Sequence, residues 1–189
     1  MRTLAELTDD ELAATAEAWR DRFAAAASEG FAYVHALVNE GRAAGSSLAH
    51  THSQLVWLRD PPPAIGAERG HGDSVRGLLD PDLVVSRAGA AVAAVHPAGR
   101  LPYETLIAAD GGELELGDAL LVLRDVVRRL RSIEGPLPWN AWLHRSAGAD
   151  HIEVVPRLSV LAGVELGAGI YVNTVDPRDA AVALRNAPV

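Results

Sequence analysis

The sequence predicts an α+β fold made of two similar halves. Each half contains an amphipathic helix, followed by a strand, a loop and a second strand. In the first half Asn39 precedes His50 by an interval that recurs between Asn140 and His151 in the second half. This shared spacing indicates an internal repeat. The chain has 189 residues, of which 49% are hydrophobic, so it can bury a substantial core.

The first half begins with a helix expected from about residue 9 to 28. Thr8 and Glu11 form the pattern of a capping box, and apolar residues recur at helical spacing after it. Two strands should follow, at about residues 31–38 and 50–58. Alternating strand formers on both sides of a Gly/Ser-rich stretch predict a hairpin with a long loop.

The second half is expected to begin after an irregular connection. A proline run after Asp60 should end the preceding strand, and the Gly- and charge-rich stretch continues to about Asp80. The elements expected beyond it are strands at 83–86, 90–96, 103–109, 139–145 and 151–157, with a helix at 117–133. The tail should add a glycine-rich strand at 169–175 and a short helix capped by Asp176.

Composition argues against several kinds of partner. The formal net charge is -8 and the pI is about 5.3, whereas nucleic acids and anionic membranes need a concentrated basic surface. The chain contains no Cys, so disulfides and a Cys-based zinc site are both excluded. No segment reaches the roughly 20 apolar residues of a membrane span, and no signal-peptide pattern opens the sequence. We therefore expect a cytoplasmic location.

Residues 39–54 form the strongest candidate for a functional site. Side chains alternate along a strand, so His50, His52 and Gln54 should share one face of the second strand. Just upstream lies a group of unencumbered backbone N–H groups and two hydroxyls, which can hold an anionic oxygen. These donors belong to Gly45, Ser46 and Ser47. A nucleophile next to an oxyanion site indicates phosphate chemistry.

Several short motifs follow one another in a recognisable order. They are Asn39-x-Gly41, Gly45-x-Ser47, His50-x-His52-x-Gln54, Glu68, Pro102-Tyr103-Glu104, His151-x-Glu153, Gly163-Val164-Glu165 and Gly169-Ile170-Tyr171-Val172-Asn173. In this order, over nearly the whole chain, they resemble the galactose-1-phosphate uridylyltransferases of the histidine-triad superfamily. The resemblance implies two tandem half-barrel-type antiparallel sheets, each with a helix, the first one incomplete. It implies a truncated first module at 1–60, a connection at 61–81 and a second module with a sugar-recognition segment at 82–189.

The resemblance also implies a ping-pong nucleotidyl transfer. His52 matches the nucleophile, which takes a uridylyl or adenylyl group from a nucleotide sugar and passes it to a hexose 1-phosphate. Covalent catalysis of this kind splits one difficult displacement into two easier ones. Gln54 matches a glutamine that donates to the phosphate oxygens, and it favours transfer over hydrolysis. The residues expected to bind substrate are Asn39, Gly45, Ser46, Ser47 and Glu165.

A metal site is implied in the second half. Glu68, His144 and His151 match three ligands of a structural metal site, and Glu153 stands where some relatives have histidine. Imidazole and carboxylate both bind zinc or iron, so either metal is possible. A buried histidine held by a carboxylate would produce the same sequence pattern without a metal.

The resemblance also implies a further half-module before the position of Met1, with strands of the first sheet and often a Cys-x-x-Cys, which this sequence does not contain. Without the cysteines, His50 is not expected to hold zinc. Without the strands, the first sheet keeps an open edge, and a homodimer is expected to cover it.

Other functions fit the same motifs. One is a shortened, non-catalytic relative that binds a nucleotide or a metal and acts as a dimeric scaffold. Another is a phosphorylase or hydrolase of dinucleoside polyphosphates, since these enzymes also use histidine-triad sites. The basic cluster of the 117–133 helix is expected to be a solvated face with no phosphate site. It consists of Arg124, Arg128, Arg129 and Arg131.

Overall fold

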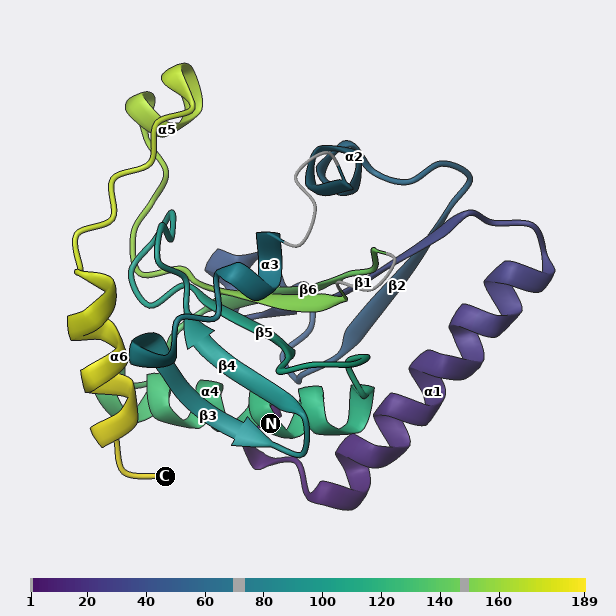
Figure 1. The fold of residues 1–189 in the computed structure, drawn as a ribbon, viewed down its shortest axis with the longest axis horizontal. Helices are drawn as coiled ribbons and strands as arrows, with labels where there is room; N and C mark the ends of the chain where they lie inside the picture. The colour runs from purple at the N-terminus through teal and green to yellow at the C-terminus, as the bar shows by residue number, and fades with distance from the viewer. Residues whose placement is uncertain (1, 70–73, 147–149) are drawn as a thin grey trace.

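A computed structural model describes residues 2–69, 74–146 and 150–189 (Figure 1). Its strands form one seven-stranded antiparallel sheet in the order β2-β1-β6-β7-β5-β4-β3. The strands are β1 (Tyr33–Glu40), β2 (Ser53–Leu58), β3 (Val84–Ala88), β4 (Ala91–Val95), β5 (Thr105–Ala109), β6 (Trp139–His144) and β7 (His151–Pro156). The predicted α+β class is confirmed, but the strands of the two halves are continuous in one sheet.

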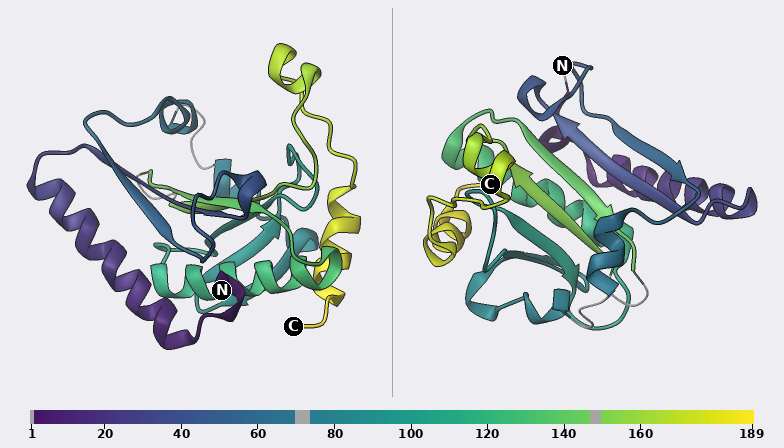
Figure 2. Two further views of the ribbon diagram at one scale, coloured as in Figure 1. Left: turned by 180° about the vertical axis from the view of Figure 1, so that it is seen from behind. Right: turned by 90° about the horizontal axis from the view of Figure 1, so that it is seen from above.

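The halves join because β1 pairs with β6 as well as with β2. Asn39 lies opposite Asn140 in this pairing, and the Nδ2 of Asn140 donates to the Oδ1 of Asn39 at 2.7 Å. The hairpins β1–β2 and β6–β7 thus lie on either side of this contact. Two separate sheets would leave the backbone groups along the second edge of β1 unpaired, and the joint sheet satisfies them. Figure 2 shows the resulting order of strands across the molecule.

Three helices cover one face of the sheet: α1 (Asp9–Ser28), α4 (Leu116–Glu134) and α6 (Pro177–Asn186) (Figure 1). On the other side lie the short helices α2 (Pro63–Arg69) and α3 (Ser74–Gly77), in the stretch where an irregular connection was expected. Short 3-10 turns occur at Leu4–Glu6, Arg42–Ala44 and Pro81–Leu83. None of the described helices is both long and apolar enough to cross a membrane.

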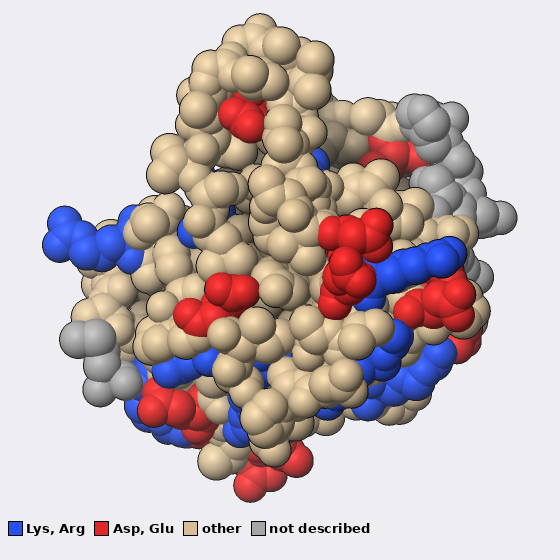
Figure 3. Space-filling model, turned by 90° about the vertical axis from the view of Figure 1, so that its left-hand side faces the viewer, with Lys and Arg blue, Asp and Glu red and all other residues tan. Residues whose placement is uncertain are grey.

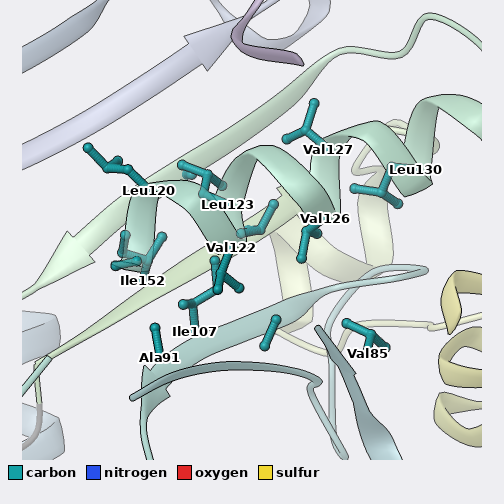
Figure 4. Packing of buried hydrophobic residues seen from close by; sticks show 14 of the residues in the cluster. Val85, Ala91, Ile107, Leu120, Val122, Leu123, Val126, Val127, Leu130 and Ile152 are labelled. Carbon is teal, nitrogen blue, oxygen red and sulfur yellow. The ribbon is translucent and has the colours of Figure 1, made fainter. Parts of the chain in front are cut away.

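The core lies between α4 and the sheet (Figure 4). The apolar stripe of α4 is almost fully buried and faces Ile107 of β5 and Ile152 of β7. This stripe contains Leu120, Leu123, Val127 and Leu130. Burial of apolar surface along it holds the sheet to its helical layer and so fixes the strand ends that carry the candidate site.

The basic cluster of α4 is not a solvated face, so that expectation is wrong. Arg124 donates to the carbonyl oxygen of Leu7 at 2.8 Å, and Arg128 donates to that of Ala5 at 2.8 Å. Arg129 reaches the carbonyl oxygen of Leu184 at 3.0 Å. The guanidinium groups therefore bind the N-terminal segment and α6 to α4, because free carbonyls at the ends of short elements need donors.

The strand expected at 169–175 is also wrong. These residues belong to a projecting arm, which we define as residues 158–175 and which includes the short helix α5 (Gly163–Ala168). Ile170 and Val172 have a high local preference for strands, but both are more than half exposed. A strand is stable only beside another strand, and the arm has none next to it in the described part of the chain.

Candidate functional site

His52 lies immediately before β2, and both of its ring nitrogens have partners. Nδ1 is 3.1 Å from the carbonyl oxygen of His50, and Nε2 is 3.3 Å from the amide nitrogen of Gln54. A carbonyl oxygen only accepts a hydrogen bond, and an amide nitrogen only donates one. Nδ1 therefore carries the hydrogen, and Nε2 presents its lone pair. This is the tautomer that a nucleophile acting through Nε2 requires.

The alternation of side chains predicted that His50, His52 and Gln54 share a strand. This prediction is wrong, because only Gln54 lies on β2. β2 begins at Ser53, because Val38 and Ser53 are its last pair with β1. After Val38, β1 pairs only with β6 among the described strands. The residues just before Ser53 therefore have no described strand beside them to pair with. The backbone carbonyl of His50 orients His52 in place of a shared strand face.

The loop between β1 and β2 is shaped by two glycines with positive φ. Gly41 has φ 88, and a Cβ there would lie 2.9 Å from the Cβ of Pro138. Gly45 adopts the left-handed conformation, with φ 85, and closes a 3-10 turn. The N–H of Ser46 then donates to the carbonyl oxygen of Gly41 at 3.2 Å, and its hydroxyl donates to that of Leu48 at 2.8 Å. These hydrogen bonds within the loop hold it in shape.

Asn140 connects this loop to the second half of the chain. Its Nδ2 donates to the Oδ1 of Asn39 and, at 2.8 Å, to the carbonyl oxygen of Ala44. Ser47 is exposed beside these residues. Sequence reasoning did not select Asn140 as a site residue, although the interval that it shares with Asn39 was the available signal. Asn39, Gly45, Ser46, His52 and Gln54 thus lie in one corner of the molecule.

A second cluster combines four side chains from three elements. Glu68 of α2, His144 of β6, and His151 and Glu153 of β7 each offer one ligand atom, and these atoms lie within 4.8 Å of one another. His144 Nδ1 is 2.6 Å from Glu68 Oε1 and 3.3 Å from Glu153 Oε1. His151 Nε2 is 3.8 Å from Glu153 Oε1. His144 faces His151 across the β6–β7 pair, which brings the two imidazoles together.

The charge states of this cluster suit metal ligands. Burial lowers the pKa of His144 below its usual value, so its imidazole is neutral at pH 7. Burial alone would raise the pKa of Glu153, but the hydrogen bond from His151 and the charge of Arg100 lower it to about 2. A neutral imidazole and an ionised carboxylate are the forms that bind metals. The buried Oε2 of Glu68 has no hydrogen-bond partner among the described residues.

Glu165 lies with neither cluster. It is on α5 of the projecting arm, where its carboxylate accepts a hydrogen bond from the N–H of Ala162 at 2.8 Å. Figure 1 shows α5 projecting from the rest of the molecule. Figure 3 shows the projecting arm as a largely uncharged surface. Among the described residues, Glu165 has no hydrogen bond or ion pair with a residue of either cluster.

Known proteins match this chain in sequence. Residues 1–62 match the family model of the galactose-1-phosphate uridyl transferase N-terminal domain. An ADP-glucose phosphorylase from Arabidopsis thaliana is 24% identical over 191 residues, a match that covers 81% of this chain and 51% of that protein. The chain thus spans about half the length of this curated relative.

Solved structures match over almost the full chain. A uridylyltransferase structure has a TM-score of 0.86 at 23% identity, covering 99% of this chain and 70% of its own. An Arabidopsis thaliana ADP-glucose phosphorylase with bound ADP-glucose has a TM-score of 0.88 at 20% identity, covering 99% and 69%. These likenesses establish the fold, and the sequence match points to the same group of proteins.

Proposed function

Since the chain is a relative of the galactose-1-phosphate uridylyltransferases in sequence and fold, we propose that it transfers a nucleoside monophosphate from a nucleotide sugar through His52. In the first step, Nε2 of His52 bonds to the α-phosphorus, and the bond from that phosphorus to the departing sugar phosphate breaks. In the second step, an acceptor phosphate attacks the same phosphorus and releases His52. The observation that carries this proposal is the tautomer of His52, with its lone pair on Nε2.

The hydrogen-bond donors of the residues around His52 suggest a role for each of them. The amide of Gln54 lies 3.3 Å from Nε2, so it is within reach of an oxygen on a phosphorus bonded there. We assign substrate binding to Asn39 and to the Gly45–Ser47 turn, whose backbone N–H groups and hydroxyls suit phosphate oxygens. We also regard residues 1–60 and 82–189 as two modules, joined by 61–81, that share one sheet.

The acceptor distinguishes two versions of this function. A hexose 1-phosphate as acceptor gives a transferase, and inorganic phosphate gives a phosphorylase. The match to an ADP-glucose phosphorylase favours the second version, because that protein's name specifies phosphate as its acceptor. Both versions use the same covalent intermediate on His52, so one labelling experiment tests them together.

We expect the wild-type chain to become labelled when it is incubated with ADP-glucose or UDP-glucose that carries ³²P at the α position. The label should be an acid-labile, base-stable nucleotidyl-histidine, because a P–N bond hydrolyses readily in acid. Chasing with glucose 1-phosphate or with inorganic phosphate then identifies the acceptor. If the nucleotide sugar raises the melting temperature but leaves no label, and the shift is the same in His52→Ala, the chain is a non-catalytic binding protein.

We further propose that Glu68, His144, His151 and Glu153 hold a zinc or iron ion. Two imidazole nitrogens and two carboxylates suit either metal. Oε2 of Glu68, which has no hydrogen-bond partner in the part of the chain that the structure describes, is explained if a cation satisfies it. Bound there, the ion would connect α2 to β6 and β7, which is a structural role away from the transfer step.

We also propose a homodimer formed through the projecting arm. Val160 is 90% exposed and Leu166 is 75% exposed, and soluble monomers rarely expose apolar groups in such a concentration. A second copy covering the arm would also place Glu165 next to residues of another subunit. Multi-angle light scattering should give a mass near twice 19.9 kDa.

A charged substitution in the arm should break this dimer. Leu166→Glu should yield a monomer, because association would bury an unpaired carboxylate. Val182→Glu is the matched control, since Val182 is an exposed apolar residue on α6 outside the arm. A monomeric wild-type chain, or an equal effect of both substitutions, would count against the arm as the interface.

A further inference from the structure

We propose that Arg100 fixes Glu153 as a one-oxygen ligand of the metal cluster and thereby favours a transition metal over calcium. The inference rests on the proposed metal site, whose four residues supply its donors. Arg100 lies in the loop between β4 and β5 and has no place in the sequence motifs discussed above. It is a positioning residue that acts on the metal through Glu153.

The two oxygens of Glu153 face different partners. Oε2 accepts a short hydrogen bond from Nη2 of Arg100. Oε1 faces the imidazoles instead, at 3.3 Å from Nδ1 of His144 and 3.8 Å from Nε2 of His151. The guanidinium therefore engages one oxygen of the carboxylate and leaves the other for the metal. The carboxylate itself is only 12% exposed, so few other orientations are open to it.

Arg100 is held rigidly by a second carboxylate. Nε and Nη2 donate to Oε1 of Glu104 at 2.9 and 2.6 Å, and Glu104 is 1% exposed. Oε2 of Glu104 accepts hydrogen bonds from the backbone N–H groups of Arg100 and Leu101, at 2.6 and 3.2 Å. Moving the guanidinium away would leave the buried carboxylate of Glu104 without its cationic partner, which is strongly unfavourable.

Two further features of this loop restrict Arg100. Its guanidinium carbon lies 5.6 Å from the centre of the Trp142 ring, a cation–π contact on the face that carries the cluster. Tyr103, next to Glu104, has φ 60, a left-handed conformation that is unfavourable for a residue other than glycine. The surrounding contacts hold the loop in this shape, so Arg100 presents a fixed donor to Glu153.

The number of donor atoms determines which metal such a site suits. With one oxygen of Glu153 engaged by Arg100, four residues that each contribute one atom give two nitrogens and two oxygens. This is a set that zinc accepts in four-coordinate geometry. Calcium takes six to eight oxygens and often binds carboxylates through both oxygens. At Glu153 this two-oxygen binding is prevented, because Arg100 occupies Oε2.

Metal binding by a double variant tests this role. Arg100→Gln combined with Glu104→Gln removes the guanidinium together with the buried Glu104 carboxylate that it pairs with, and so frees only Oε2 of Glu153. Arg87→Gln is the matched control, because Arg87 pairs with Asp110 at 2.8 Å on the surface, away from the cluster. Each protein is freed of metal with a chelator and then titrated with cobalt(II) chloride, and with zinc against a chromophoric competitor. Circular dichroism verifies that the variants are folded.

We expect the double variant to bind zinc about 10- to 100-fold more weakly, as is typical when a residue that orients a ligand is lost. Its bound cobalt(II) should also absorb visible light less strongly per ion, because a second oxygen of Glu153 raises the coordination number. The Arg87→Gln control should match the wild type in both measurements.

Three results would overturn the proposal. Unchanged zinc affinity together with an unchanged cobalt spectrum in the folded double variant means that Arg100 does not position Glu153. Tighter zinc binding means that the charge of Arg100 merely repels the cation. A wild-type chain that binds neither metal removes the metal site itself, while the ³²P labelling of His52 remains an independent test of the transfer function.

Discussion

Replacing His52 with alanine is expected to abolish the labelled intermediate and to lower the rate of nucleotidyl transfer by at least about 10³-fold, as losses of a catalytic nucleophile do. The alanine variant has no Nε2 lone pair to attack the α-phosphorus, and the hydrogen-bond partner of Gln54 is lost with it. The measurements are the initial rate of product formation and the amount of ³²P bound to the protein after denaturation.

His50→Ala is the matched control for this prediction. Both histidines lie in the same loop, but the contribution of His50 is its backbone carbonyl, which alanine retains. We therefore expect His50→Ala to keep its label and to transfer within a few-fold of the wild-type rate. A loss as large as that of His52→Ala would mean that the side chain of His50 takes part in the reaction, contrary to the geometry.

Zinc is expected to have the second large effect, on stability. The proposed ligands come from α2, β6 and β7, so the site exists only in the folded chain. A ligand that binds only the folded state, present at 100 times its Kd, raises the free energy of unfolding by about 2.7 kcal/mol. For a chain of this size this corresponds to an increase in Tm of roughly 5–10 °C. Thermal denaturation after chelation, with and without added zinc, measures this shift.

His151→Ala should eliminate the zinc-induced shift, whatever its effect on the metal-free protein. The comparison is between shifts, so a lower starting Tm in this variant does not disturb it. His50→Ala should keep the full shift, since His50 is not part of the cluster. If the shift persists in His151→Ala, zinc binds elsewhere on the chain.

Elements with strong local signals could be predicted closely from the sequence. α1 occupies the residues expected for it, because its capping box is local and the side chain of Thr8 does accept the N–H of Glu11. The same holds for α6, where the carboxylate of Asp176 accepts the N–H of Arg178. The strand expected at 169–175 is wrong because strand formation depends on a neighbour that local sequence does not specify.

The candidate site likewise has features that the sequence predicted and features that only the structure shows. The order and spacing of motifs selected His52, Gln54 and the four residues of the metal cluster, and the structure gathers each of these groups in space. The tautomer of His52 depends on a backbone carbonyl, and the orientation of Glu153 depends on Arg100. The motif that contains His50 does not show where its backbone carbonyl points, and Arg100 lies outside every motif, so sequence reasoning had no signal for either contact.

The sequence by itself determined the α+β class, the positions of the three longer helices and of the strands of the sheet, and the residue types available for phosphate and metal chemistry. These properties follow from local capping, apolar periodicity and motif order, all of which are written along the chain. Only the tertiary structure decided that the two halves share one sheet through β1 and β6, and which nitrogen of His52 carries the lone pair. The same is true of the contact by which Arg100 restricts Glu153. Each of these depends on contacts between segments or on backbone geometry, which a linear pattern does not contain.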